Sequence, residues 1–323
     1  MRAALIGAGF HARTNLFPGM KEAGFEIVAV TTRSLESAER ALRDFGSAGR
    51  AYTDYTEMLT QEQVEAVIIC LQPADQVEVV RSCLAAGCAV YVEKPLGLSV
   101  RQAEELAGLV TDQVTSVGFM KRYAPVYTKL KQVLVQNTYG NLRSFELRFA
   151  CDASGFCHDR ADFLSLAAIH QLDLIRFLAG EVEEITGMSL ETDGELHLQL
   201  SLRMKNGAVG QVTLINAPLY TREVEELTLR FEQAVCQVEE MQRLIIEEKQ
   251  EPTSWQELDA RQMHYRSPMS TMSGGMKDLY LRGFVGEMNH FKAAVEGGDA
   301  SRSDFQDNVK TMQLIQDILD TIR

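Results

Sequence analysis

The beginning of the chain combines a short apolar run with a glycine turn. Ala3–Ile6 is apolar, and the segment Gly7-Ala8-Gly9-Phe10-His11-Ala12 follows it directly. We expect a strand at the apolar run and a helix that begins after the turn. Because a strand that turns sharply into a helix starts a strand–helix–strand unit, this feature predicts a parallel sheet covered by helices.

Further apolar runs continue this pattern as far as Gly118. We expect strands at Glu26–Thr31, Val64–Leu71, Ala89–Glu93 and Thr115–Gly118. Apolar residues at helical spacing predict helices over Ser34–Phe45, Asp75–Ala86 and Ser99–Val110. The alternation of strands and helices predicts a doubly wound parallel sheet in this part of the chain.

Strand-like runs dominate the rest of the sequence. They are Leu142–Ala150, Val182–Leu190, Glu195–Met204, Val209–Ile215 and Leu227–Glu232. Asn206-Gly207 favours a tight hairpin between two of them, and the glutamates of Glu223–Glu251 suit the solvated side of strands. We therefore predict an α/β protein with two domains, residues 1–120 and 121–323, the second built on an open, mostly antiparallel sheet.

Helical spacing also marks three later segments, Asp162–Leu178, Phe284–Val295 and Asp304–Ile322. Ser267–Gly275, which is rich in Ser, Met and Gly, predicts a mobile loop.

Charge and composition exclude several classes of protein. Lys and Arg number 32 against 45 Asp and Glu, and the resulting net charge of −13 opposes binding to nucleic acid. No apolar run is long enough to cross a membrane, and the run after Met1 is too short for a secretion signal. The six cysteines form no Cys-x-x-Cys pair, which suits reduced thiols. We expect a cytoplasmic protein without membrane or nucleic-acid partners.

The glycine turn has the chemistry of a dinucleotide site. Gly7 permits a tight turn, Gly9 allows the main chain to approach a pyrophosphate, and Ala12 allows the helix to pack closely on the strand. We predict that Gly7, Gly9, Phe10, His11 and Ala12 bind a nucleotide cofactor. The alternative is a glycine turn in an α/β domain that binds no ligand.

The end of the second predicted strand bears on the choice of cofactor. An acidic residue there would bind the ribose 2′-hydroxyl of NAD, but the sequence is Thr31-Thr32-Arg33-Ser34. A guanidinium between two hydroxyl groups suits a 2′-phosphate. We therefore predict NADP(H), with NAD(H) as the alternative cofactor, bound by Thr32, Arg33 and Ser34. Otherwise Arg33 is an exposed arginine beside a serine that caps a helix.

A lysine follows the predicted strand Ala89–Glu93, in the segment Glu93-Lys94-Pro95. Ligands of doubly wound sheets bind at the carboxyl ends of the strands. A partly desolvated lysine beside a nicotinamide has a lowered pKa and can exchange a proton with a substrate oxygen. On its own the tripeptide is unremarkable, because a surface lysine is usually only solvated.

In combination these segments resemble the Gfo/Idh/MocA family of NAD(P)-dependent oxidoreductases. The resemblance rests on Gly7–Ala12, Glu93-Lys94-Pro95, Gly118–Pro125 and His170-Gln171-Leu172-Asp173, and it extends over essentially the whole chain. It implies an NAD(P)-binding Rossmann domain followed by a domain for substrate binding and oligomerisation.

The resemblance also implies roles for individual residues. Lys94 is expected to be a catalytic acid/base that contacts the cofactor together with Glu93, and Arg122 and Tyr123 are expected to line the substrate cleft. A homodimer or homotetramer is expected to form through the sheet of the second domain.

His170 has two interpretations. It lies in the apolar segment Leu166–Leu174, where a single histidine is typically part of the core. The resemblance instead places His170 at the substrate pocket as a second catalytic residue, with Asp173 beside it, and an imidazole can donate to a substrate oxygen.

The chain departs from the family pattern one helical turn before this histidine. Many members carry an aspartate at the position of Leu166, and Asp162 is too far along a regular helix to replace it. Three alternatives follow from this departure. Lys94 and His170 suffice for catalysis, or the substrate is unusual, or the protein no longer catalyses a reaction.

Two further segments remain. Leu71, Gln72 and Pro73 are expected to lie beside the nicotinamide ribose, although Gln76 stands where relatives often have histidine. Residues 151–160 supply His158 and Arg160, which either bind substrate or belong to an ordinary polar loop. Cys151, Cys157 and His158 lack a fourth ligand at a familiar spacing, so we expect no metal site.

The leading hypothesis is an NADP(H)-dependent oxidoreductase that transfers hydride between nicotinamide and a carbonyl or secondary alcohol. The substrate would be sugar-like or another small polar molecule. The alternatives are an NADP(H)-binding sensor or regulator without turnover, and a reductase of a non-sugar ligand such as an imine or a tetrapyrrole. Phe163, Leu164 and Leu166 are compatible with the more apolar pocket that this last ligand needs.

Overall fold

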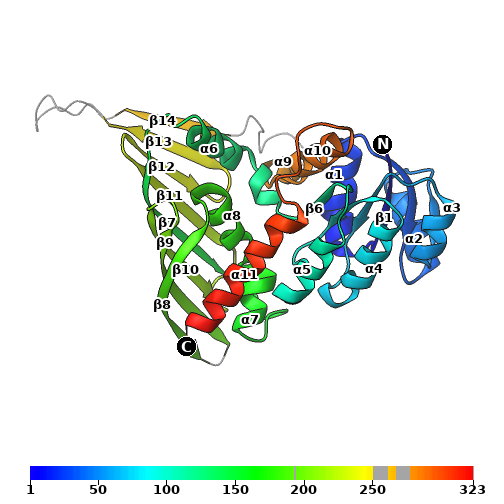
Figure 1. Cartoon of the computed structure of the whole chain (residues 1–323), viewed down its shortest axis with the longest axis horizontal. Coiled ribbons are helices and arrows are strands. Elements are labelled where there is room, and N and C mark those ends of the chain that lie inside the picture. The colour runs from blue at the N-terminus through cyan, green and yellow to red at the C-terminus, as the bar shows by residue number, and fades with distance from the viewer. Residues whose placement is uncertain (193, 250–260, 267–276, 323) are drawn as a thin grey trace, which may run out of the picture. The chain divides into compact units, whose positions relative to one another are not determined.

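The computed structural model describes residues 1–192, 194–249, 261–266 and 277–322 (Figure 1). The predicted mobile loop, Ser267–Gly275, lies outside these residues. Close contacts divide the chain into two units. The first comprises Met1–Met120 and Gly283–Gln313, and the second comprises Lys121–Arg282 and Leu314–Arg323.

A parallel six-stranded sheet forms the centre of the first unit, with the strand order β3-β2-β1-β4-β5-β6. Its strands are β1 (Arg2–Ile6), β2 (Glu26–Thr31), β3 (Arg50–Tyr52), β4 (Ala66–Ile69), β5 (Ala89–Val92) and β6 (Thr115–Val117). Its helices include α1 (Phe17–Glu22), α2 (Leu35–Asp44), α3 (Tyr55–Gln61), α4 (Pro73–Ala85) and α5 (Val100–Gly108). The predicted doubly wound fold is confirmed, and the strand order is that of a dinucleotide-binding sheet.

The local structure of this unit follows from its residues. Every side chain of β4 and of β5 is buried, as expected for strands covered on both faces. Ser34 and Ser99 cap α2 and α5 by accepting hydrogen bonds from main-chain N–H groups. The short strand β3 and helix α3 were not expected from the sequence, because only one side chain in each is buried.

The second unit is built on an eight-stranded sheet, with the order β14-β13-β12-β11-β7-β10-β9-β8. Its strands are β7 (Leu142–Cys151), β8 (Val182–Thr192), β9 (Glu195–Met204), β10 (Val209–Asn216), β11 (Val224–Phe231), β12 (Ala234–Glu239), β13 (Arg243–Glu248) and β14 (Gln262–Arg266). Strands β7 and β10 pair in parallel, and the other neighbouring strands pair antiparallel. The prediction of a mostly antiparallel sheet is confirmed.

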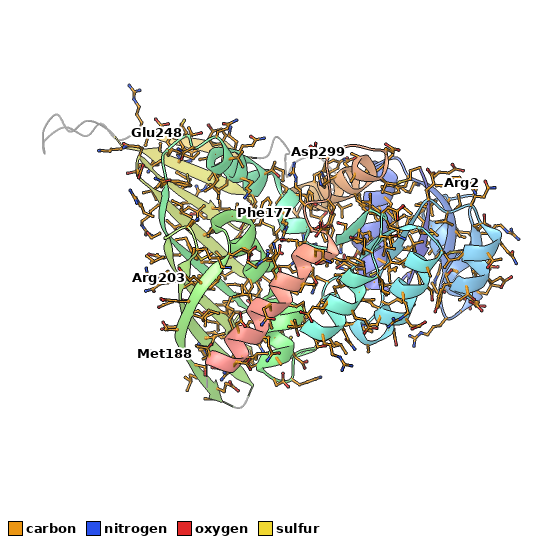
Figure 2. The ribbon with its side chains drawn as sticks, in the orientation of Figure 1. Arg2, Phe177, Met188, Arg203, Glu248 and Asp299 are labelled. Atoms are coloured by element: carbon orange, nitrogen blue, oxygen red, sulfur yellow. The ribbon has the colours of Figure 1, made fainter. Side chains whose placement is uncertain are left out.

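One face of this sheet is packed and the other is open. In β9 the side chains alternate, with Leu196, Leu198, Leu200, Leu202 and Met204 buried. Helices α6 (Pro125–Val135), α7 (Arg160–Asp162) and α8 (Ile169–Ala179) lie on the packed face (Figure 1). Met188 and Arg203 lie along the opposite face (Figure 2).

The segment Asp162–Leu178 is helical as expected, but it is not one regular helix. A π-helical turn, Phe163–Ala167, separates α7 from α8, and the N–H of Ala168 donates to the carbonyl of Phe163 at 2.8 Å. Residues four apart across Ala168 therefore do not have the spacing of a regular α-helix. Phe163 and Leu164 are fully buried, and the Phe163 ring stacks near Phe149. These two side chains belong to the core.

The end of the chain returns to the first unit. Helix α9 (Lys277–Leu281) belongs to the second unit, whereas α10 (Phe284–Val295) and the first part of α11 (Phe305–Thr321) belong to the first. A Cβ atom added at Gly19 of α1 would lie 3.4 Å from the Met288 side chain of α10, so the two helices pack closely. Ser303 forms hydrogen bonds with the edge strand β6. Among the helices that the structure describes, none is long and apolar enough to cross a membrane.

Candidate functional site

Four loops meet at the carboxyl edge of the six-stranded sheet. They follow β2, β1, β4 and β5, which are consecutive neighbours in the sheet. These loops, with the first residues of the helices that follow them, carry all the predicted cofactor-binding residues, so the sheet brings together segments that are far apart in the sequence. The position between β1 and β4 is the one where the strand order reverses and where such sheets bind their ligands.

Glycine is found at positions 7 and 9 of the first loop for different structural reasons. Gly7 has a φ of 90°, and a Cβ atom there would overlap the carbonyl oxygen of Cys70. A Cβ atom at Gly9 would have no described atom within 4 Å. The fold therefore requires the first glycine, whereas the second leaves open space at the start of a helix.

His11 and Glu93 join the first loop to the end of β5. His11 Nε2 lies 3.2 Å from Glu93 Oε1, and His11 Nδ1 lies 3.1 Å from the amide nitrogen of Asn15. Because an amide N–H donates to Nδ1, the neutral imidazole with its proton on Nε2 satisfies both contacts. Phe10 is 84% exposed, and Ala12 is buried.

A buried hydrogen-bond network continues from Glu93. The hydroxyl of Tyr91 lies 3.2 Å from Glu93 Oε1 and 2.8 Å from Glu287 Oε2. Glu93 is 7% exposed, and Glu287 and Tyr91 are fully buried. Burial raises the pKa of Tyr91 well above its ordinary value, and the two nearby carboxylates raise it further. Tyr91 therefore stays protonated and can donate to either carboxylate.

Lys94 is half-buried in the loop after β5, followed by the buried Pro95. Gln76 lies beneath this loop. Its Nε2 donates to the carbonyls of Leu71, at 3.1 Å, and of Glu93, at 3.0 Å. The glutamine thereby links the ends of β4 and β5.

The loop after β2 presents an exposed cation. Thr32 Oγ1 donates to the carbonyl of Ser34, and Ser34 Oγ caps α2 through the N–H of Ser37. The Arg33 side chain is exposed and makes no hydrogen bond or ion pair with any residue that the structure describes. It is available to an external anion.

Two charged residues predicted to contact substrate in the second unit are paired with each other. Arg122 donates to Asp173 through Nε at 2.7 Å and through a terminal nitrogen at 2.5 Å. They are 2% and 1% exposed. The guanidinium also lies 5.2 Å from the ring centroid of Phe177. This bidentate pair ties the start of the unit to helix α8.

A second buried polar cluster, centred on Glu225, was not expected from the sequence. Its carboxylate accepts hydrogen bonds from Lys121 at 2.6 Å, Tyr127 at 2.6 Å and Gln171 at 2.7 Å. Burial opposes the charged form, but these three donors hold the pKa of Glu225 below its usual value. Glu225 lies on β11 among exposed glutamates, so its inward direction is fixed by strand alternation. That alternation was the available sequence signal.

His170 lies in the first turn of α8 and is half-buried, and Tyr123 is buried. Leu166, at the position of the expected aspartate, is half-buried in the π-helical turn. Asp162 accepts a hydrogen bond from the N–H of His158 at 3.0 Å, so its carboxylate caps the preceding loop. Lys94 belongs to the first unit and His170 to the second.

Of the remaining predicted substrate residues, Arg160 contacts β8. Arg160 donates to Glu191 and Ser189 of that strand and to the carbonyl of Ile322, while His158 is exposed. No group of three or more potential metal ligands gathers anywhere in the described part of the chain.

Comparison with known proteins agrees with this architecture. Residues 1–119 match the family described as "Oxidoreductase family, NAD-binding Rossmann fold", and residues 127–232 match the "GFO/IDH/MocA C-terminal domain". Over its full length the fold is similar to that of levoglucosan dehydrogenase, solved with NADH. The TM-score is 0.83 at 20% identity, with coverage of 99% of this chain and 96% of the other.

Two curated relatives match more locally. Trans-1,2-dihydrobenzene-1,2-diol dehydrogenase of Mus musculus is 31% identical over 48% of this chain and 47% of its own length. Inositol 2-dehydrogenase/D-chiro-inositol 3-dehydrogenase of Lactiplantibacillus plantarum is 25% identical over 56% of this chain and 53% of its own length. The chain thus matches about half the length of these relatives. The two family matches and the two sheets together show that the chain belongs to the Gfo/Idh/MocA oxidoreductase family.

Proposed function

We propose that the protein is an NADP(H)-dependent dehydrogenase or reductase. It would act on a secondary alcohol, or the corresponding carbonyl, of a small sugar-like molecule. The observation that carries this proposal is the meeting of the open Gly9 turn and the half-buried Lys94 at one edge of the six-stranded sheet. Bound there, the dinucleotide supplies or accepts the hydride.

The residues at this edge fit a dinucleotide. Gly9 leaves the space that a pyrophosphate needs, and no acidic residue occupies the first turn of the following helix. Arg33 is exposed, and the loop after β2 offers hydroxyl groups on both sides of it. An unpaired guanidinium favours a cofactor with a 2′-phosphate over NAD(H).

In this proposal Lys94 exchanges the proton of the substrate oxygen. Its Nζ would accept a proton as an alcohol is oxidised, or donate one as a carbonyl is reduced. Its partial burial reduces competition from water. Glu93, the residue before Lys94, is held through its carboxylate by His11 and Tyr91, so the lysine follows an anchored residue.

In the second unit His170 is proposed to orient the substrate oxygen. The Arg122–Asp173 pair then acts indirectly, because Asp173 lies one turn after His170 on α8 and holds that helix in place. Direct substrate contacts from Arg122 would require this buried pair to open, which is costly. Tyr123, His158 and Arg160 remain proposed lining residues.

The names of the relatives support the substrate class. One is a dehydrogenase of a dihydrobenzene diol and another a dehydrogenase of inositol, and both substrates carry secondary alcohols on a ring. We therefore propose a cyclic polyol, or the matching ketone, as the first substrates to test.

Replacement of Lys94 by alanine tests the proposal. General acid–base groups contribute about 10²- to 10⁴-fold, so Lys94→Ala should lower kcat by about this factor with myo-inositol or a related cyclic polyol. NADPH affinity, measured by nicotinamide fluorescence, should stay nearly unchanged. The exposed Lys205, replaced by alanine, provides a matched control.

Undiminished turnover in Lys94→Ala would refute the role of the lysine. NADPH binding without turnover across a broad panel of polyols and carbonyls would instead favour the sensor, which Leu166 motivates because a carboxylate is missing there. Turnover restricted to imines or other non-sugar carbonyls would favour the second alternative.

We also propose a homodimer or homotetramer that forms through the open face of the eight-stranded sheet. Met188 and Leu190 are 68% and 59% exposed on β8, and strand pairing places both on the same side as Gln199 and His197 of β9. Apolar side chains on an open sheet face favour association. Sedimentation of the wild type and of Met188→Lys should separate oligomer from monomer.

A cytoplasmic location is part of the same proposal. All six cysteines are free thiols, and burial raises the pKa of Cys83, Cys151 and Cys236 to about 12. Such thiols suit a reducing compartment.

A further inference from the structure

Gln76 is a fully buried amide at the edge of the sheet where the cofactor is proposed to bind. It lies in the first turn of α4, which follows the loop after β4. Its contacts are with main-chain groups, and this determines what it can do.

Both N–H groups of the Gln76 amide are used. One carbonyl that accepts from Nε2 belongs to Leu71, at 3.1 Å, in the loop proposed to contact the nicotinamide ribose. The other belongs to Glu93, at 3.0 Å, and is the carbonyl group of the peptide bond to Lys94. A single side chain therefore fixes the main chain at two adjacent loops of the site.

Residue 93 is held from two directions. Gln76 holds its carbonyl, while Tyr91 and His11 hold its carboxylate. Rotation about the main chain of Glu93 would swing Lys94, and each of these bonds opposes that rotation. The N–H of Glu93 also donates to the carbonyl of Ile69 at 2.9 Å. Gln76 therefore supplies the hydrogen bond on the carbonyl side of residue 93, the side that leads into Lys94.

The other atom of this amide is unsatisfied. Gln76 Oε1 is buried and has no hydrogen-bond partner among the described residues. A buried polar atom without a partner costs about 1–3 kcal/mol, so packing alone would favour an apolar side chain of the same length. The polar residue is explained by its two N–H bonds.

We propose that Gln76 is a positioning residue that sets the direction of Lys94 by fixing the carbonyl groups of Leu71 and Glu93. This inference rests on the proposed function for its catalytic consequence. The placement of Lys94 itself can be tested whether or not the protein turns over a substrate.

The key variant is Gln76→Met, which keeps the length of the side chain and removes both donors. Gln76→His retains an N–H donor and is the conservative variant. Gln113→Met is the matched control, because Gln113 also donates to a main-chain carbonyl, that of Leu84 in the last turn of α4. Thermal unfolding of all three variants identifies any loss of folding.

The first readout needs no substrate. Trinitrobenzenesulfonate labels lysine amines, and peptide mass spectrometry measures the labelling rates of Lys94 and Lys205 with and without NADPH. We expect Gln76→Met to raise the Lys94 rate about 10-fold and to weaken its protection by NADPH, by analogy with the cost of misplacing a reacting group. The Lys205 rate and the Gln113→Met protein should match the wild type.

The second readout separates catalysis from binding. With a cyclic polyol that the wild type oxidises, kcat of Gln76→Met should fall about 10- to 100-fold while KM for NADP changes less than about 2-fold. Gln76→His should recover part of the loss in both readouts. A merely structural role would lower thermal stability without this split or this recovery.

Unchanged Lys94 labelling in a folded Gln76→Met protein overturns the positioning role, whatever the activity. If Gln76→Met does not fold, Gln76→Leu, which also removes both donors, takes its place, and wild-type Lys94 labelling in that folded variant overturns the role equally. Altered labelling in a protein that turns over no polyol or carbonyl would refute the proposed enzyme and leave the positioning role intact.

Discussion

The cofactor edge of the first unit and the polar core of the second unit use charged and polar groups in opposite ways. At the edge, Arg33 is exposed and Gly9 presents main chain to open space. In the second unit, Arg122 and Lys121 are at most 5% exposed and each is paired with a carboxylate. The first arrangement leaves groups available to a ligand, whereas the second stabilises the scaffold around His170.

This difference shows that a motif residue can serve its site without touching a ligand. The two charges of Arg122 and Asp173 neutralise each other in a buried bidentate contact. Their contribution is the position of α8. Substitutions in the two regions should therefore separate loss of stability from loss of binding.

The largest expected effect is on stability, in the second unit. Arg122→Met should lower the free energy of unfolding by about 3–5 kcal/mol, because it leaves the Asp173 carboxylate buried without its cation. Urea unfolding followed by circular dichroism measures the loss. The double variant Arg122→Met/Asp173→Leu should regain much of it, and equal stability of the single variant and the wild type would contradict this interpretation.

The next effect is on binding, in the first unit. Gly9→Val should weaken NADPH binding about 100-fold, or ~2.7 kcal/mol, because the side chain occupies space reserved for the ligand. Its melting temperature should remain close to that of the wild type, since no described atom lies within 4 Å of the new Cβ. Gly7→Ala provides the contrast, because its Cβ overlaps Cys70 and should destabilise the fold. Normal NADPH affinity in Gly9→Val would exclude this loop as the cofactor site.

A smaller effect should distinguish the two cofactors. Arg33→Ala should weaken NADPH binding about 10-fold, or ~1.4 kcal/mol, and leave NADH binding unchanged. Titration of both reduced cofactors against both proteins measures the ratio, and Arg40→Ala on the exposed side of α2 serves as control. An equal loss for NADH would show that Arg33 does not recognise the 2′-phosphate.

The smallest effect is a pH dependence that belongs to Glu225. Its pKa is lower in the folded than in the unfolded protein, so its contribution is complete above the unfolded value near 4.5. That contribution is lost as the pH falls through the lower, folded value. In Glu225→Gln the melting temperature should therefore fall less steeply than in the wild type as the pH is lowered from 6. An unchanged slope would show that other carboxylates cause the loss of stability in acid.

The architecture of the first unit was predictable because its signals are local. The glycine turn and the buried apolar strands fix the parallel sheet, and Ser34 and Ser99 cap helices as expected. Parallel strands bring their carboxyl ends to one edge, so Lys94 was placed beside the cofactor loops by topology alone.

The features that escaped prediction depend on long-range pairing or on local geometry that the residue pattern does not distinguish. The link from Tyr91 to Glu287 spans most of the chain, and a glutamate in an amphipathic helix gives no sign of its partner. The π-helical turn at Phe163–Ala167 arises in a segment whose apolar residues also suit a regular helix. The roles of Arg122 and Asp173 were inferred from a motif, which identifies residue types but not which of them pair.

The return of Gly283–Gln313 to the first unit affects how the protein is made and how it can be divided. During translation the hydrogen bond between Tyr91 and Glu287 cannot form until nearly the whole polypeptide has left the ribosome. A gene fragment that stops at residue 120 lacks that partner. Exchange of cofactor modules between relatives would consequently require two crossover points rather than one.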